Sequence, residues 1–108
     1  MSEIEITTSF EMIAEHVIFR VVINNTSENN ISNVEVILNF SNSLSKLIGE
    51  DRKIINSILP KESRVIEFTF KCPGNFNSEK IGAYIIYYNH KGKKCFASIL
   101  PQKIDLFM

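Results

Sequence analysis

The chain has 108 residues, enough for one hydrophobic core of ordinary size but not for two. Hydrophobic residues make up 44% of it, and twelve Lys and Arg balance twelve Asp and Glu. This composition is typical of a folded globular domain and speaks against a disordered chain or a nucleic-acid-binding one. We therefore expect a single domain over residues 1–108, with no nucleic acid as partner.

The sequence contains no run of about eighteen apolar residues, and its start, "MSEIEITTSFEM", lacks the basic and then apolar stretch of a signal peptide. Cys72 and Cys95 are its two cysteines, and they fit reduced, buried thiols that pack as small hydrophobes. A fragment cut from a secreted protein remains an alternative. We expect a cytoplasmic protein without membrane insertion.

Apolar and polar residues alternate with a period of two through most of the chain, which indicates strands. "EIEIT" is the first predicted strand, and "FEMI" either continues it or begins another. "VIFRVVIN" is apolar on both faces apart from Arg20, as expected of a central strand. "VEVILNF" places one set of residues inward: Val34, Val36, Leu38 and Phe40.

Between these last two strands stands the polar stretch "NNTSENNISN", residues 24–33. Asn and Ser can satisfy backbone groups with their short side chains, so this stretch predicts a loop. The loop is longer than a tight hairpin, which leaves the flanking strands free to lie in different sheets.

The next region, "SNSLSKLIGEDRKIINSIL", is the one place where a helical turn is an open alternative, because Leu44, Leu47 and Ile48 are spaced like a helix face. "KIINSIL" reads as a short strand and "PKES" as a turn. "RVIEFTFKC" is a strand whose predicted inward residues are Ile66, Phe68, Phe70 and Cys72. After the polar "PGNFNSEK", the segments "IGAYIIYYN" and "KKCFASILP" form a hairpin around "HKG", and "KIDLF" is a last extended piece.

The predicted fold class is all-β: a single antiparallel two-sheet sandwich of about seven or eight strands. The chain has no Trp, so the Cys-Trp-Cys signature of true immunoglobulin domains is missing. It is therefore immunoglobulin-like (Ig-like) in architecture only.

Three stretches, "RVVINNTSENNISNVEVILNF", "ILPKESRVIEFTF" and "IGAYIIYYNHKGKK", carry a resemblance over residues 15–101. They resemble Ig-like modules of two kinds: cell-adhesion-related repeat domains of bacteria and archaea, and the appendage sandwiches of vesicle-coat adaptor proteins. The shared pattern is one of strands and turns, so no functional residue transfers with it. The resemblance implies a non-enzymatic domain that binds other proteins or spaces larger domains apart.

Catalytic and metal-binding patterns are missing from the sequence. His16 and His90 stand outside any metal-ligand spacing, and there is no nucleophile elbow or Gly-rich phosphate loop. We predict no catalytic, cofactor-binding or metal residues and no cofactor. An enzyme whose site converges from distant loops is the weakest of the functional alternatives.

The turn "NHKG", residues 89–92, fits a type I turn followed by glycine in the left-handed region. This turn sets Asn89 opposite Lys93 and so fixes the register of the whole hairpin. One face then holds Ala83, Ile85, Tyr87, Cys95, Ala97 and Ile99; the other holds Tyr84, Ile86, Tyr88, Lys94, Phe96 and Ser98.

Lys94 identifies the outer face, since a lysine is rarely buried without a partner. We predict that an outer patch binds protein through aromatic anchors; its residues are Tyr84, Ile86, Tyr88, Lys94, Phe96 and, from a neighbouring strand, Ile37. In the alternative, another strand or a chain end covers the patch. The leading hypothesis is a protein-interaction module for a protein or peptide, with a homodimer through a sheet face or edge left open. A structural spacer is the second hypothesis.

Overall fold

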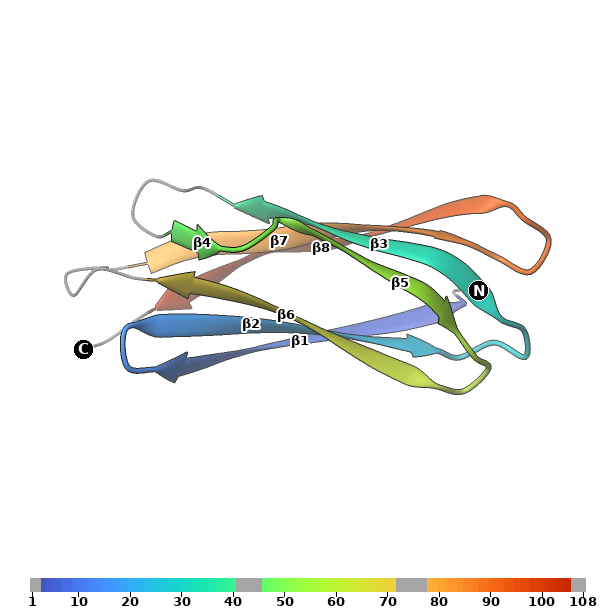
Figure 1. Cartoon of the computed structure of the whole chain (residues 1–108), viewed down its shortest axis with the longest axis horizontal. Coiled ribbons are helices and arrows are strands. Elements are labelled where there is room, and N and C mark those ends of the chain that lie inside the picture. The colour runs from blue at the N-terminus through green and yellow to red at the C-terminus, as the bar shows by residue number, and fades with distance from the viewer. Residues whose placement is uncertain (1–2, 41–45, 72–77, 106–108) are drawn as a thin grey trace.

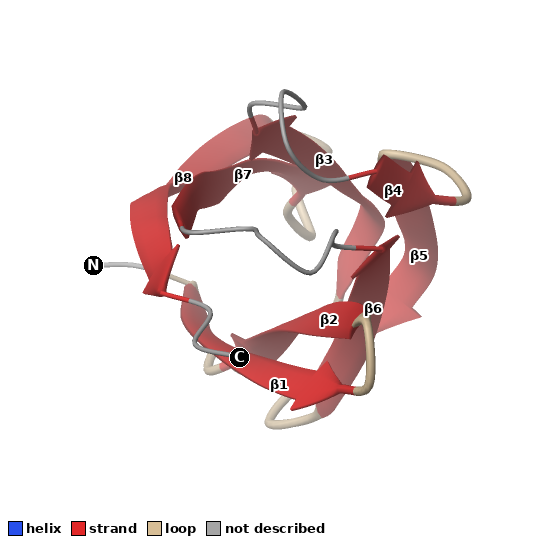
Figure 2. Cartoon of the chain, turned by 90° about the vertical axis from the view of Figure 1, so that its left-hand side faces the viewer, coloured by secondary structure: helices blue, strands red, loops and turns tan. Residues whose placement is uncertain are grey.

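Eight strands form two four-stranded antiparallel sheets that stack face to face (Figures 1 and 2). The structure, a computed structural model, describes residues 3–40, 46–71 and 78–105. The first sheet has the order β1 (Ile4–Ile13), β2 (His16–Asn25), β6 (Ser63–Lys71), β4 (Lys46–Ile48). The second has the order β5 (Arg52–Ile58), β3 (Ile31–Phe40), β7 (Ser78–Tyr88), β8 (Lys94–Asp105). The predicted all-β sandwich is confirmed; that residues 1–108 form one domain stays a prediction.

One hydrophobic core lies between the sheets, because alternate residues of each strand point inward. The predicted inward residues of β3 and β6 are buried, with Phe40 half-buried against the core, while Cys72 lies outside the described residues. The largest fully buried side chains come from both sheets: Phe19, Phe68, Phe70, Ile23, Ile31, Ile58, Ile81 and Ile85.

The β2 strand is central, as predicted, with β1 on one side and β6 on the other. Its lone charged residue, Arg20, lies on the outer face between two carboxylates from the neighbouring strands. The Arg20 guanidinium is 2.5 Å from Glu67 and 2.6 Å from Glu11. Hydrogen bonds to Glu67 and then Glu11 raise the pKa of Arg20 above its usual value. This charged row lies on the solvent side of the first sheet.

The loop between β2 and β3 is shorter than predicted, because the strands take up both ends of residues 24–33 and leave 26–30 between them. Asn25 ends β2 with its side chain buried, at 1% exposure. Its Nδ2 donates to the carbonyl oxygens of Asn29 (2.8 Å) and Ile58 (2.9 Å), and its Oδ1 accepts from the Ser27 hydroxyl (2.7 Å). The loop carries the chain from one sheet to the other, as expected.

An extra residue at Asn33 interrupts the alternation of β3. The pairing of β3 with β7 shifts between Ser32 and Glu35, and Asn33 has a φ of 49°. Asparagine tolerates this left-handed conformation better than most residues. The bulge explains why Ile31 and Val34, three positions apart, are both buried.

Three other predictions are settled by the strand bounds. "FEMI" continues the first strand, since β1 runs unbroken to Ile13. The helical turn is wrong where the structure describes it: Leu47 and Ile48 lie in β4, which pairs with β6, and Leu44 lies outside the described residues. The predicted extended piece "KIDLF" is strand over residues 103–105, but it continues β8 through a bulge between the pairs with Ile81 and Ala83; Leu106 and Phe107 lie outside the described residues.

Candidate functional site

The turn between β7 and β8 has the predicted conformation. The Gly92 N–H donates to the carbonyl oxygen of Asn89 (2.9 Å), the Asn89 N–H donates to that of Lys93 (3.0 Å), and Gly92 has a φ of 74°. The Asn89 side chain adds two contacts, since its Oδ1 accepts from the N–H groups of Lys91 and Lys93, both at 3.0 Å. Asn89 therefore holds the turn with its side chain as well as its backbone.

The predicted register follows from this turn and is confirmed. Tyr88 pairs with Lys94, Ile86 with Phe96, and Tyr84 with Ser98. The face with Ala83, Ile85 and Tyr87 is buried in the core, and the face with the outer patch points to solvent. Tyr84 is 52% exposed and Phe96 is 71% exposed, while Ile37, Ile86 and Tyr88 are half-buried.

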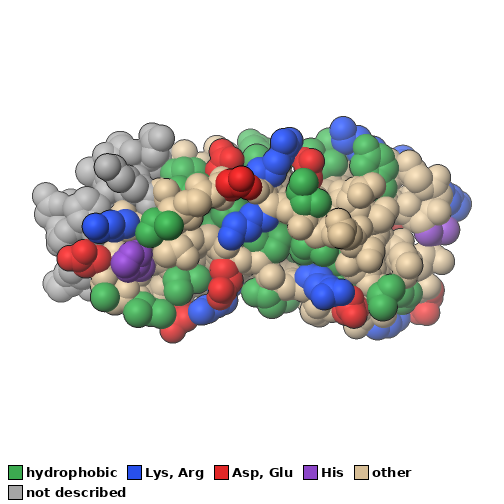
Figure 3. All heavy atoms as spheres, viewed as in Figure 1, with side chains coloured by type: hydrophobic (Ala, Val, Ile, Leu, Met, Phe, Trp, Pro, Cys, Tyr) green, Lys and Arg blue, Asp and Glu red, His purple; other side chains and the backbone are tan. Residues whose placement is uncertain are grey.

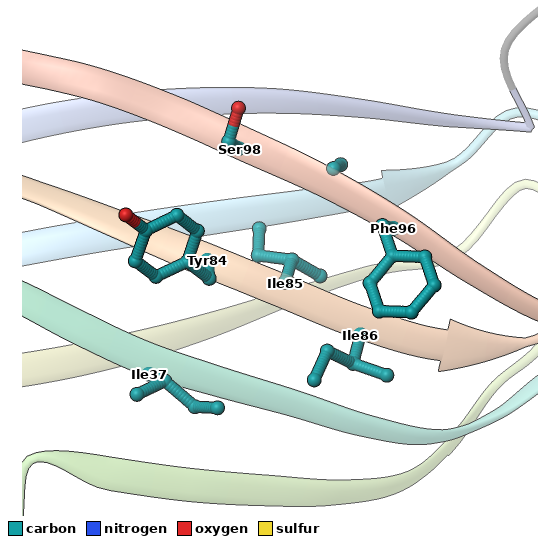
Figure 4. A pocket seen from close by; sticks show the side chains of 7 residues that line it. Ile37, Tyr84, Ile85, Ile86, Phe96 and Ser98 are labelled. Atoms are coloured by element: carbon teal, nitrogen blue, oxygen red, sulfur yellow. The ribbon is translucent and has the colours of Figure 1, made fainter.

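Four residues of the outer patch, Ile37, Tyr84, Ile86 and Phe96, line a shallow groove of about 530 Å3 (Figure 4). The other two, Tyr88 and Lys94, line a separate hollow beside it. Ile37 of β3 lies across from Tyr84 of β7, and Ile86 lies across from Phe96 of β8. The Asn39 amide donates a hydrogen bond to the Tyr84 hydroxyl (3.4 Å), at the side of the groove formed by Tyr84. Apolar groups dominate the lining, which consists of Ile37, Tyr84, Ile85, Ile86, Phe96, Ala97 and Ser98.

Charged side chains border the groove on one side. The Lys94 Nζ lies 5.7 Å from the centre of the Phe96 ring, within the range of a cation–π contact. Beyond Ile86, a second hollow of about 360 Å3 is lined by polar residues, among them Glu35 and Arg52, which form an ion pair at 3.3 Å. The apolar groove therefore has a mixed, mainly cationic polar rim.

Two exposed apolar residues beside the outer patch were not predicted. Leu100 of β8 is 79% exposed and extends the apolar surface along that strand. Ile54 of β5 is 60% exposed and lies opposite Glu35. Leu100 was predictable, because it follows Phe96 and Ser98 at a period of two. Ile54 was not, because "KIINSIL" contains apolar residues in both alternating positions.

Beneath the hairpin, Tyr87 is buried beside Cys95 and Glu3. Burial first, and then the negative charges and hydrogen bonds of Cys95 and Glu3, raise the pKa of Tyr87 to about 12. Cys95 is a free, half-buried thiol whose Sγ lies 3.8 Å from a Glu3 carboxylate oxygen. This cluster belongs to the core side of the hairpin and has no part in the groove.

The seam between β5 and β6 carries a more polar hollow, of about 640 Å3. The Lys53 Nζ spans the seam, since it donates to the Glu67 carbonyl oxygen (2.6 Å) and lies 5.2 Å from the Phe68 ring centre. On this side of the molecule, hydrophobic side chains lie scattered among charged ones (Figure 3). The seam therefore offers no apolar surface comparable to the outer patch.

His16 opens β2 and His90 lies in the β7–β8 turn, at opposite ends of the long axis (Figure 1). Over residues 3–40, 46–71 and 78–105, no three His, Cys, Asp or Glu side chains gather where they could hold a metal ion. The same ranges contain no helix long and apolar enough to span a membrane.

Comparison with solved structures shows the same fold at low sequence identity. The GAE domain of GGA2p from Saccharomyces cerevisiae superposes with a TM-score of 0.63 and 17% identity, over 96% of this chain and 89% of that one. A protein described as ApaA from Bordetella pertussis gives 0.62 and 13%, over 95% and 93%. A FixG-related protein from Vibrio parahaemolyticus gives 0.56 and 8%, over 97% of each chain.

No family model matches the sequence, and no curated protein matches it either. The structural likeness to the GAE domain fits the resemblance to adaptor appendage sandwiches, at the level of the fold. The resemblance to adhesion repeats stays a prediction. The chain is thus an Ig-like two-sheet sandwich with an apolar groove on the outer face of one sheet.

Proposed function

We propose that this chain is a non-enzymatic protein-interaction domain, and that its outer patch binds an apolar segment of a partner protein. The observation that carries the proposal is the exposure of Tyr84 and Phe96 on either side of an apolar groove. Aromatic side chains held in this way are common anchors of protein interfaces, because they offer large contact area at low entropic cost.

The groove suits a protein or peptide better than a small substrate. It is shallow, and its polar groups are the Tyr84 hydroxyl and Ser98 rather than an acid–base pair. Lys94 and the Glu35–Arg52 pair at its border can supply the polar rim that interfaces usually have. The likeness to the GAE domain, a domain of a larger protein, supports a binding module over a free-standing enzyme.

We also propose that the domain acts in the cytoplasm, a reducing compartment that suits the free thiol of Cys95. We further propose that it does not bind nucleic acid. Twelve cationic and twelve anionic residues balance each other, and this balance would weaken attraction to a phosphate backbone. Retention of the protein on a heparin column at low salt would contradict this part of the proposal.

The test replaces the two anchors with serine in the variant Y84S/F96S. The matched control is I13S/V65S, which removes two exposed apolar residues (49% and 57%) from the other sheet. All three proteins are immobilised and exposed to lysate of the source organism. We expect partners that the wild type and the control retain and that Y84S/F96S loses, since anchor residues contribute about 2 kcal/mol or more, roughly thirtyfold in affinity.

Thermal unfolding separates binding from folding. Both double variants should melt close to the wild type, because the replaced side chains are exposed. Identical sets of captured proteins from all three samples would contradict the proposal and favour a structural spacer. Unfolding of Y84S/F96S alone would show that the patch is needed for stability instead.

A further inference from the structure

The β8 strand is an open sheet edge. It ends the second sheet, where its partner is β7, and no described strand lies on its other side (Figure 2). An open edge presents backbone N–H and C=O groups that can pair with another strand. Which groups these are follows from the hairpin register.

The Asn89 N–H donates to Lys93, so residues 89 and 93 face each other across the hairpin. Hydrogen-bonded and non-hydrogen-bonded pairs alternate along antiparallel strands. Cys95, Ala97 and Ile99 therefore direct their backbone groups to β7. The backbone groups of the residues that alternate with them point to the open side: Lys94, Phe96 and Ser98.

The open stretch is bounded at both ends by features that oppose pairing. Lys93 and Lys94 begin it, and lysines are a common protection of sheet edges. At the other end the register shifts just after Ile99, and Pro101 has no N–H to donate. The unprotected window is residues 95–100, and no charged residue lies within it.

The exposed side chains of this window are symmetric about its centre. Phe96 and Leu100 are the two most exposed large hydrophobic residues of the described chain, at 71% and 79%. They stand two positions before and two positions after Ser98, on the same face of the strand. An antiparallel copy of the window centred on Ser98 would therefore place each Phe96 opposite a Leu100.

We propose that two copies of this chain dimerise through β8, antiparallel and with Ser98 paired with itself on the two-fold axis. The contact joins two four-stranded sheets into one. It forms backbone hydrogen bonds around the Ser98 pair and brings each Phe96 beside a Leu100, while Lys93 and Lys94 of one copy lie at the opposite end of the contact from Lys93 and Lys94 of the other. This self-pairing shares Phe96 with the outer patch, but it uses the edge of β8 and needs neither Tyr84 nor the rest of the groove.

The dimer is expected to be weak. So short a window buries less than the roughly 800 Å2 per partner of a standard interface, which suggests a dissociation constant on the order of 10 to 100 µM. Sedimentation velocity from about 1 to about 500 µM covers this range. We expect the average mass to rise from monomer to dimer with concentration. A monomer at every concentration would overturn the proposal.

Two variants locate the contact. S98P removes an N–H that points away from β7, and L100K places a charge in the window; either should weaken dimerisation at least about tenfold. Y84S, which alters the groove, should dimerise like the wild type. L100K serves as the test if S98P does not fold. Dimerisation of both variants at wild-type strength would refute the β8 contact and leave the proposed function untouched.

Cysteine variants test the register. In a Ser98-centred pair the two Ser98 Cα atoms lie about 5.5 Å apart, within the range of a disulfide. S98C should form a reducible dimer under mild oxidation, beyond any formed by the wild type with its own cysteines. F96C, whose neighbour is Leu100 of the other copy, should not. Crosslinking of F96C but not S98C would contradict the Ser98 register.

Discussion

At the residue scale, Asn25 organises the passage from one sheet to the other. Its side chain makes four hydrogen bonds, to Ser27 N and Oγ and to the carbonyl oxygens of Asn29 and Ile58. Its own backbone bonds to Glu62 and Lys61, which lie in the turn before β6. A polar side chain this deeply buried is stabilising only while all its partners are in place.

Replacing Asn25 with alanine should lower the free energy of unfolding by about 2 to 4 kcal/mol, because the buried Ile58 carbonyl oxygen loses its donor and the loop loses its other bonds to this side chain. Urea denaturation measures the loss. The control is N30A in the same loop, where the side chain is exposed and a change of no more than about 0.5 kcal/mol is expected. Equal stability of N25A and N30A would mean that the loop does not need the Asn25 network.

Tyr87 should make stability fall at alkaline pH. Its pKa is raised to about 12 in the folded protein, from an ordinary value of 10, first by burial. Its contribution is complete below pH 10, where both states hold the proton. Between pH 10 and 12 the unfolded chain loses the phenol proton first, so stability declines by at most about 2.7 kcal/mol.

Denaturant unfolding of the wild type and Y87F at several pH values tests this. Because other groups also titrate there, the informative quantity is the difference between the two proteins, which should change between pH 10 and 12 and be constant at lower pH. Parallel curves through the whole range would show that burial does not perturb Tyr87.

At the scale of elements, the β7–β8 hairpin was predictable down to its register, because a local signal sets it. The four residues of "NHKG" determine the turn, and every later pair follows by counting. The candidate site was predictable for the same reason, since its residues alternate along two strands joined by that turn. Ile37, from a third strand, was predicted from its alternation in β3.

Asn89 is the residue on which this local signal rests. N89A removes the acceptor for the Lys91 and Lys93 N–H groups and should destabilise the domain by about 1 kcal/mol, measured by thermal or urea unfolding. N30A, in the loop before β3 where the side chain is exposed, is the control and should have a smaller effect. A loss in N30A as large as in N89A would argue against the role of the turn.

Other elements depend on contacts that no local pattern reveals. β4 has three residues, and it is a strand because Leu47 lies opposite Phe70 of β6, not because of its own sequence. The bulge at Asn33 shifts the inward face of β3, so alternation counted from Val34 would place Ile31 on the wrong side. Tertiary pairing decides both features.

At the scale of the whole molecule, composition and alternation were sufficient to predict a two-sheet sandwich, and the length of the loop after β2 allowed β2 and β3 to lie in different sheets, as they do. They could not show whether the outer patch is covered, because covering depends on where distant segments pack. The exposure of Tyr84 and Phe96 answers that question for the structure.

The strand order also limits when the chain can fold during its synthesis. β2 carries Phe19, Val21 and Ile23 on its inner face, but its second neighbour, β6, is made some forty residues later: Arg20 contacts Glu67, 47 positions along the chain. β3 likewise lacks its second neighbour until β7 has been synthesised. Until both late strands have left the ribosome, the β1–β2 and β3–β5 pairs each lack the strand that completes their sheet. We expect this chain to stay unfolded through most of its translation and to need protection from aggregation during that time.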